Sequence, residues 1–124
     1  MNRGELHIEH KPNGTVTIFV KLADDGNVWL SKYEIADFLG VHIQSVTANL
    51  RELFRSEELL EYNVATSKEG TTFYNLDVVI ALAFRCKGGY CRPIREWIRD
   101  RIKRPLVESR QPVIIQIGNS VIHS

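Results

Sequence analysis

The sequence lacks any apolar run close to the roughly 18 residues that a membrane-spanning helix needs. Residues 1–11 alternate charged residues with isolated apolar ones and contain no apolar segment typical of a signal peptide. Cysteine is scarce, and its 2 residues are too few for a disulfide framework. We therefore expect a cytoplasmic protein that does not use a membrane.

The motifs that carry enzymatic chemistry are also missing. There is no Gly-x-Ser-x-Gly elbow, no Cys-His signature, no carboxylate cluster for a metal-dependent nuclease, and no phosphate-binding loop around Gly88-Gly89. Cys86 and Cys91 have four residues between them, but the histidines are scattered, so two further zinc ligands are lacking. We expect a protein that is not an enzyme and uses no cofactor and no metal, with two ordinary reduced thiols.

Charge is nearly balanced overall but unevenly distributed along the chain. Residues 1–84 hold 7 Lys/Arg against 12 Asp/Glu, whereas residues 85–104 hold 8 against 2. A single basic segment on an acidic body indicates a face for a polyanion such as nucleic acid. The alternative is a solvated basic helix with no partner.

A hydrophobic content of 44% in 124 residues is enough for one core, so we expect a single domain. Two stretches rich in strand-forming residues, 5–10 and 15–22, are joined through Pro12-Asn13-Gly14. Asn-Gly between such stretches predicts a β-hairpin with a tight turn that has positive φ at both residues. Val28-Trp29-Leu30 predicts a third strand.

The hydrophobic period changes at Ser31. Ser31 with Glu34 three residues later is the capping-box pattern of a helix start, and Gly40 suits the left-handed residue that ends a helix. A second amphipathic helix follows the glycine, which predicts a helix-turn-helix. The apolar faces comprise Ile35, Ala36, Phe38 and Leu39 in the first helix and Val46, Leu50, Leu53 and Phe54 in the second.

Strand-forming residues return after the second helix. Residues 64–66 and 71–74 flank the polar break Ser67-Lys68-Glu69-Gly70, which predicts a second hairpin with Lys68 at its tip. Asn75 is a suitable cap for a helix that Gly88-Gly89 would end, and the wide apolar face of that helix predicts extensive burial.

A last, basic helix is predicted between Pro93, which suits a first turn, and Pro105, which would end the helix. Its apolar stripe is Ile94, Trp97, Ile98 and Ile102. The run at residues 113–117 fits an edge strand, a dimer contact or a mobile end, and the sequence does not choose among them.

This order of elements predicts an α+β fold, namely a winged helix-turn-helix domain with an N-terminal β-hairpin and a C-terminal basic helix. The hairpin occupies residues 1–30, the winged domain and its following helices residues 31–104, and a tail residues 105–124.

If the apolar residues of the second helix face the core, its remaining residues are candidates for the DNA major groove. Arg51 can pair with guanine and Gln44 with adenine, while the hairpin and the basic helix can contact phosphates. This prediction requires Arg51 and the basic helix to face in one common direction, close enough together to straddle a duplex. Asn49 stands where an apolar residue is usual, which leaves a rotation of this helix open. The candidate DNA-binding residues are His42, Gln44, Ser45, Thr47, Ala48, Arg51, Arg55, Lys68, Arg92, Arg95, Arg99 and Lys103.

Several runs together resemble the N-terminal region of RhuM-like virulence-associated proteins. They are Val28-Trp29-Leu30-Ser31, the helix-turn-helix to Phe54, the run from Phe73 to Ile80, and Arg95-x-Trp97, so the resemblance covers residues 28–103. It implies a bacterial DNA-binding protein. We expect sequence-specific binding of double-stranded DNA by a homodimer that regulates transcription or a mobile element. The alternative is a protein–protein interaction module on the same scaffold.

Overall fold

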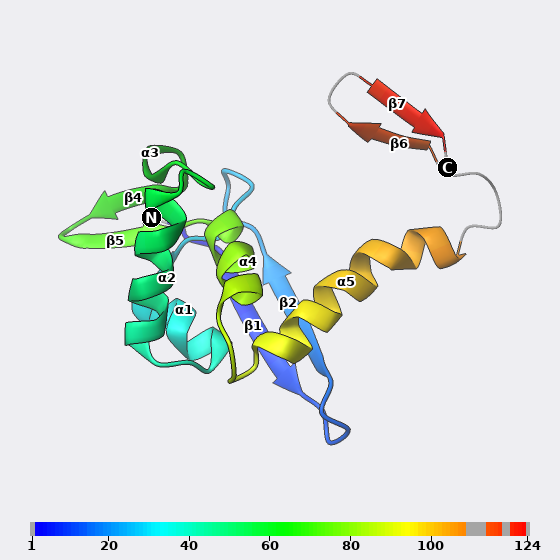
Figure 1. The fold of residues 1–124 in the computed structure, drawn as a ribbon, viewed down its shortest axis with the longest axis horizontal. Coiled ribbons are helices and arrows are strands. Elements are labelled where there is room, and N and C mark those ends of the chain that lie inside the picture. The colour runs from blue at the N-terminus through cyan, green and yellow to red at the C-terminus, as the bar shows by residue number, and fades with distance from the viewer. Residues whose placement is uncertain (1, 109–113, 118–119, 124) are drawn as a thin grey trace.

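The computed structural model describes residues 2–108, 114–117 and 120–123. These residues form an α+β fold in which every strand pairing is antiparallel (Figure 1). The sheets have the orders β1-β2, β3-β5-β4 and β6-β7. The elements are β1 (Glu5–His10), β2 (Val16–Lys21), β3 (Leu30–Ser31), α1 (Lys32–Leu39), α2 (Ile43–Arg55), α3 (Glu61–Val64), β4 (Ala65–Lys68), β5 (Thr71–Tyr74), α4 (Leu76–Arg85), α5 (Cys91–Glu108), β6 (Ile114–Ile117) and β7 (Ser120–His123).

The first hairpin forms as predicted, but its turn does not. β1 pairs with β2 from Glu5–Lys21 to His10–Val16, which leaves a five-residue loop at residues 11–15. Only Gly14 of this loop has a positive φ, at 85°. The carboxamide oxygen of Asn13 instead accepts hydrogen bonds from the backbone N–H and the hydroxyl of Thr15. Asn13 therefore stabilises a wider loop through its side chain, and the predicted tight turn was wrong.

The helix-turn-helix is confirmed, with the predicted caps. The Ser31 hydroxyl accepts from the backbone N–H of Glu34, and the Glu34 carboxylate accepts from that of Ser31, which completes the capping box of α1. Gly40 ends α1 in the left-handed conformation at φ 68°, and two further residues lead into α2. A Cβ at residue 40 would lie 2.6 Å from the ring of Tyr90, so glycine is also required by close packing.

The second hairpin forms the wing. β4 pairs with β5, and β5 also pairs with β3, so the wing is joined to the strand that precedes α1. The turn is Glu69-Gly70, and both residues have positive φ, as a two-residue hairpin turn requires. Lys68 therefore belongs to β4 and flanks the turn rather than forming its tip. The short helix α3 was not predicted, because four residues are too few for a periodic pattern.

The last two helices differ from the prediction at their ends. α4 starts at its predicted cap, Asn75, but ends at Arg85, before the glycines. Its exposed residues Ile80 and Phe84 show that the expected burial was only partial. α5 continues through Pro105 to Glu108, so the predicted end at Pro105 was wrong. A proline removes one helical hydrogen bond, and the helix is exposed here, where water can satisfy the freed carbonyl.

The loop between α4 and α5 contacts the turn of the helix-turn-helix. The backbone N–H of Tyr90 donates to the carbonyl of Leu39, the last residue of α1, at 2.8 Å. The Tyr90 ring packs against Gly40 and lies 4.1 Å from the ring of His10, measured between centroids. This contact fixes the start of α5 against α1 and β1.

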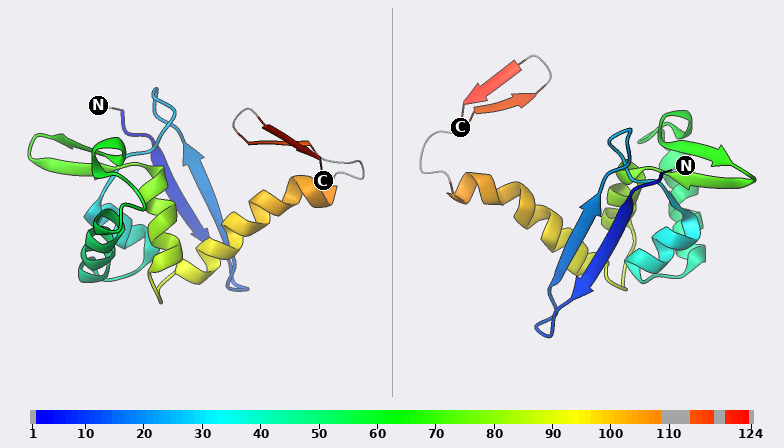
Figure 2. Two further views of the ribbon diagram at one scale, coloured as in Figure 1. Left: turned by 45° about the horizontal axis from the view of Figure 1, so that its top comes forward. Right: turned by 180° about the vertical axis from the view of Figure 1, so that it is seen from behind.

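α4 lies in the middle of the domain. α2 packs against one part of it and α5 against another, while α5 also contacts β2. Figures 1 and 2 show α2 and the wing at one end of the molecule, and α5 extending from the other, with α4 and the first hairpin between them. The core residues include Ile35, Leu39, Leu53, Leu82 and Ile94, which come from all four of the longer helices.

β6 and β7 form a hairpin of their own, paired from Ile114–His123 to Ile117–Ser120. The sequence allows the run at residues 113–117 to be an edge strand, a dimer contact or a mobile end. Residues 114–117 of this run form a strand paired with β7. Residue 113 lies outside the described residues.

Candidate nucleic-acid interface

The outer face of α2 has the composition and exposure that a recognition helix needs. Val46, Leu50 and Leu53 are buried in the core, as their spacing predicts. The opposite side therefore faces solvent, and Gln44, Ala48 and Arg51 are exposed. Among the described residues, Arg51 has no hydrogen-bonding or ion-pair partner. Its guanidinium is available to a base or a phosphate.

The start of α1 extends this face. Lys32 and Tyr33 line an open cleft of about 390 Å³ together with five residues of α2, namely Ile43, Gln44, Thr47, Ala48 and Arg51. The Lys32 ammonium lies 5.4 Å from the centre of the Tyr33 ring, which is 66% exposed. Neither residue was predicted as a DNA contact, because the candidates were taken from the second helix, the second hairpin and the basic helix. Their exposure next to α2 is a signal that only the fold provides.

The wing continues the same surface. Lys32 and Tyr33 also line a second cleft, of about 300 Å³, together with Gly70, Thr71, Thr72 and Tyr74. These two residues of α1 therefore lie between the cleft at α2 and the cleft at the wing. On the other side of β5, Lys68 lines a shallow cleft with Arg3 and Phe73. Arg3 lies over the Phe73 ring and pairs with Glu34 at 2.6 Å, so its charge is already partnered. Lys68 is the exposed cation of the wing.

His42 and Thr47 border this face. His42 is the exposed N-cap of α2 and makes no capping bond with its side chain, while its carbonyl accepts from Ser45 and Val46. Thr47 is half-buried in the cleft beside Arg51. Both residues lie where the prediction placed them.

Ser45 does not belong to the exposed face. Its hydroxyl lies 3.8 Å from the sulfur of Cys86, on the side of α2 that faces α4. Asn49 lies on the same side, where its amide donates to the Ser45 carbonyl at 2.8 Å and contacts the Cys86 sulfur at 3.6 Å. Asn49 thus occupies the expected apolar position with its polar group satisfied, so α2 is not rotated. The placement of Ser45 at the groove was wrong.

Arg55 is neutralised within α2. Its guanidinium forms two hydrogen bonds to the Glu52 carboxylate, at 2.5 and 3.0 Å. These bonds hold the pKa of Glu52 below its usual value and raise the pKa of Arg55 above its own. A phosphate would have to displace the carboxylate, so Arg55 contributes less positive charge than its exposure suggests.

The basic helix α5 does not share a face with α2. It starts on the far side of α4 and extends away from α2 and the wing (Figures 1 and 2). The expectation that the two basic features point in one direction was wrong, because the sequence periodicity of α5 does not encode the side of α4 on which it packs.

The cations of α5 are also largely engaged. Arg92 pairs with Glu96 at 3.2 Å, and the Arg99 guanidinium lies over the Phe84 ring. Arg95 is half-buried and donates to the carbonyls of Ala83 and Cys86, so it caps the end of α4. Lys103 is exposed on the outer half of the helix. Of the predicted cluster Arg92, Arg95, Arg99 and Lys103, none lies beside Arg51.

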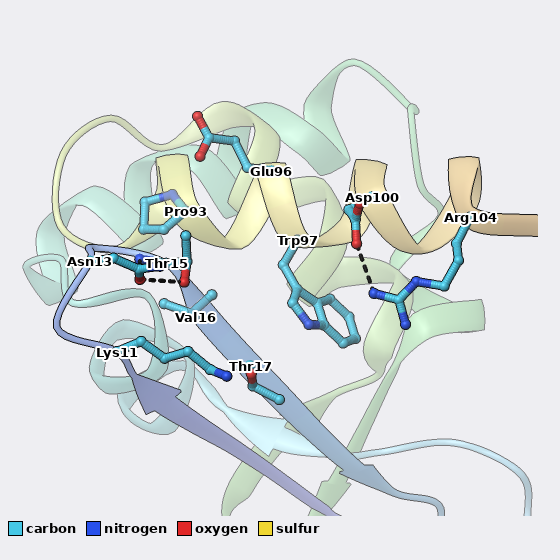
Figure 3. A pocket seen from close by; sticks show the side chains of 10 residues that line it. All are labelled: Lys11, Asn13, Thr15, Val16, Thr17, Pro93, Glu96, Trp97, Asp100 and Arg104. Carbon is cyan, nitrogen blue, oxygen red and sulfur yellow. Dashed lines mark hydrogen bonds and ion pairs between the residues drawn. The ribbon is translucent and has the colours of Figure 1, made fainter. Parts of the chain in front are cut away.

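The largest cleft lies elsewhere, between α5 and the loop of the first hairpin. It has a volume of about 420 Å³, and Figure 3 shows Trp97 reaching from α5 toward Thr17 of β2, with the Asp100–Arg104 ion pair at its edge. Its charged groups do not form a nucleophile–base pair. Among the described residues, no group of three or more His, Cys, Asp or Glu side chains could hold a metal ion. Nor does any helix in the described part of the chain have the length and apolarity to cross a membrane.

Cys86 and Cys91 are both buried, reduced thiols. Burial, together with the neighbouring Cys86, raises the pKa of Cys91. A buried thiol with a raised pKa is a weak nucleophile, in keeping with packing at the start of α5.

Comparison of the chain with protein-family models gives no match. Comparisons with curated proteins and with solved structures give no match either.

Proposed function

We propose that this protein binds double-stranded DNA in a sequence-specific manner, with α2 in the major groove and the wing on the adjacent backbone. The observation that supports this most strongly is the exposed surface formed by α2, the start of α1 and the wing. It presents Arg51, Gln44 and Thr47 on one helix beside Lys32 and continues along the wing to Thr72 and Tyr74, while Lys68 lies on the other side of β5 next to the turn of the wing. This is the division between base-reading and phosphate-contacting groups that DNA readers use.

α5 has no part in this proposal. Its distance from α2 and the internal pairing of its cations leave Lys32, Arg51 and Lys68 as the phosphate and base contacts of one protomer. A role in transcriptional or mobile-element regulation is part of the same proposal, and the resemblance of residues 28–103 to RhuM-like proteins supports it.

The experiment is selection of duplexes from a random pool by the purified protein, followed by affinity measurements on the enriched sequence. We expect an enriched motif with at least one guanine. Arg51→Ala should reduce the discrimination at that guanine by about 1–3 kcal/mol, because it removes the two donors that read the base edge.

Arg92→Ala is the matched control. It removes the same charged group from an exposed helical position on α5, where the arginine pairs with Glu96 among the residues that the structure describes. It should leave both the motif and the affinity unchanged. A pool with no enriched sequence would contradict the proposal, as would equal effects of the two substitutions.

A further inference from the structure

An open apolar trough lies between the first hairpin, α4 and α5. α4 and α5 diverge from the loop that joins them, and the hairpin passes behind both (Figures 1 and 2). None of the residues that line the trough carries a charge. They include Leu6 and Val20 of the hairpin, Leu76 and Ile80 of α4, and Ile94 and Ile98 of α5.

The trough is not covered by the described part of the chain. Val20 and Ile80 on its rim are 45% and 38% exposed. The apolar stripe of α5 starts inside the trough at the buried Ile94, passes through the half-buried Ile98 and reaches Ile102, which is 67% exposed. The stripe therefore extends beyond the surface that the domain itself can bury, as is typical of an element with a second partner.

Charge around the trough is complementary to charge on α5. Leu76, which lines the trough, is followed in the chain by Asp77, and the loop after β2 adds Asp24 and Asp25. The backbone N–H of Leu76 bonds to the side chain of Asn27, which places this acidic loop at the start of α4. Beyond Ile98, α5 carries four basic residues against two acidic residues, Asp100 and Glu108.

We infer that the trough, whose volume of about 90 Å³ admits one side chain, receives Ile102 from α5 of a second copy of this chain, in a two-fold dimer. Ile102 of one copy packs against Val20 and Ile80 of the other, and the basic residues around Ile102 face the acidic rim. Each copy supplies one helix and one trough, so the contact is self-complementary and closes at two copies. The recognition helices lie at the other end of each domain and remain free.

Analytical ultracentrifugation of the full chain without DNA tests this inference. We expect a mass twice that of the 14.2 kDa chain. Ile102→Glu and Ile80→Glu should each weaken the dimer at least about tenfold, because each places a charge in an apolar contact near its centre. Both residues are exposed in one copy, so the circular dichroism spectrum and thermal midpoint of each variant should stay close to those of the parent.

Tyr62→Glu is the control. Tyr62 is 79% exposed on α3, away from the trough, so this change should leave the dimer intact. A monomeric parent protein would overturn the inference, and so would a dimer that tolerates both substitutions. Loss of the dimer in Ile115→Glu but not in Ile102→Glu would assign the contact to the β6-β7 hairpin and would also overturn it. None of these outcomes depends on DNA, so they are independent of the proposed function.

Discussion

The salt dependence of DNA binding tests the position of α5 directly. Two lysines, Lys32 beside α2 and Lys68 in the wing, have no ion-pair partner among the described residues and are the phosphate contacts of the proposed complex, while Arg51 reads a base. Each phosphate contact contributes about −0.9 to the slope of log affinity against log salt, so one protomer should give a slope of about −1.8. Between 50 and 200 mM salt, that slope corresponds to a loss of affinity of about 12-fold.

The alternative arrangement, in which α5 also contacts the duplex, gives a very different value. Adding Arg92, Arg99 and Lys103 would raise the number of phosphate contacts from two to five, so the slope would be about −4.5 and the loss of affinity about 500-fold. The two arrangements therefore differ by roughly a factor of 40 over an accessible range of salt.

Fluorescence anisotropy on a labelled duplex with a single half-site measures the slope per protomer. Lys68→Ala should reduce its magnitude by about 0.9, whereas Lys103→Ala, the matched lysine on α5, should leave it unchanged. A parent slope near −4.5, or a slope of smaller magnitude in Lys103→Ala, would refute the placement of α5 away from the DNA.

Three further predictions concern single residues. Gly40→Ala should lower the free energy of unfolding by about 1–2 kcal/mol for the left-handed conformation and by about 1–3 kcal/mol more for the overlap with Tyr90. Gly26 also has a positive φ, but a Cβ there would meet nothing within 4 Å, so Gly26→Ala should cost only the conformational contribution. Equal losses of unfolding free energy in urea for the two variants would contradict this. Partial burial would raise the pKa of Glu34, but hydrogen bonds from Arg3 and Ser31 outweigh it and hold the pKa below 4.5. The Glu34 carboxylate therefore stabilises the fold above pH 4.5, and this contribution is lost as the pH falls through the lowered pKa. Glu34→Gln should make the decline of unfolding free energy between about pH 5 and 3 less steep, by less than about 1 kcal/mol because the Arg3–Glu34 ion pair is partly exposed. An unchanged pH profile would argue against this ion pair. Ser45→Ala should change DNA affinity by less than about twofold, since its hydroxyl faces Cys86, and a larger loss in anisotropy titrations would place this residue at the groove.

Local chemistry made much of this fold predictable. Ser31, Glu34 and Gly40 fix the ends of α1 through bonds within a few residues, and Asn75 caps α4 in the same way. The buried positions of α2 follow from helical spacing alone. These interactions join residues that are only a few positions apart in the chain, so the sequence alone predicts them.

The errors arose where the outcome depends on distant contacts. The direction of α5 is set by its packing on α4 and β2, which no periodicity records. Ser45 and Asn49 are polar, so the sequence alone did not show whether they face the DNA groove or another helix. The position of α4 decides this, because Cys86 at its end contacts both side chains. Pro105 was predicted to end the last helix, but an exposed, projecting helix can continue through a proline.

The bond between Tyr90 and Leu39 joins the ends of two helices that are far apart in the chain. The residue before α5 is held by the last carbonyl of α1, and its ring fills the space beside Gly40 at the bend between α1 and α2. We therefore expect a substitution that displaces Tyr90 to disturb that bend as well as the start of α5.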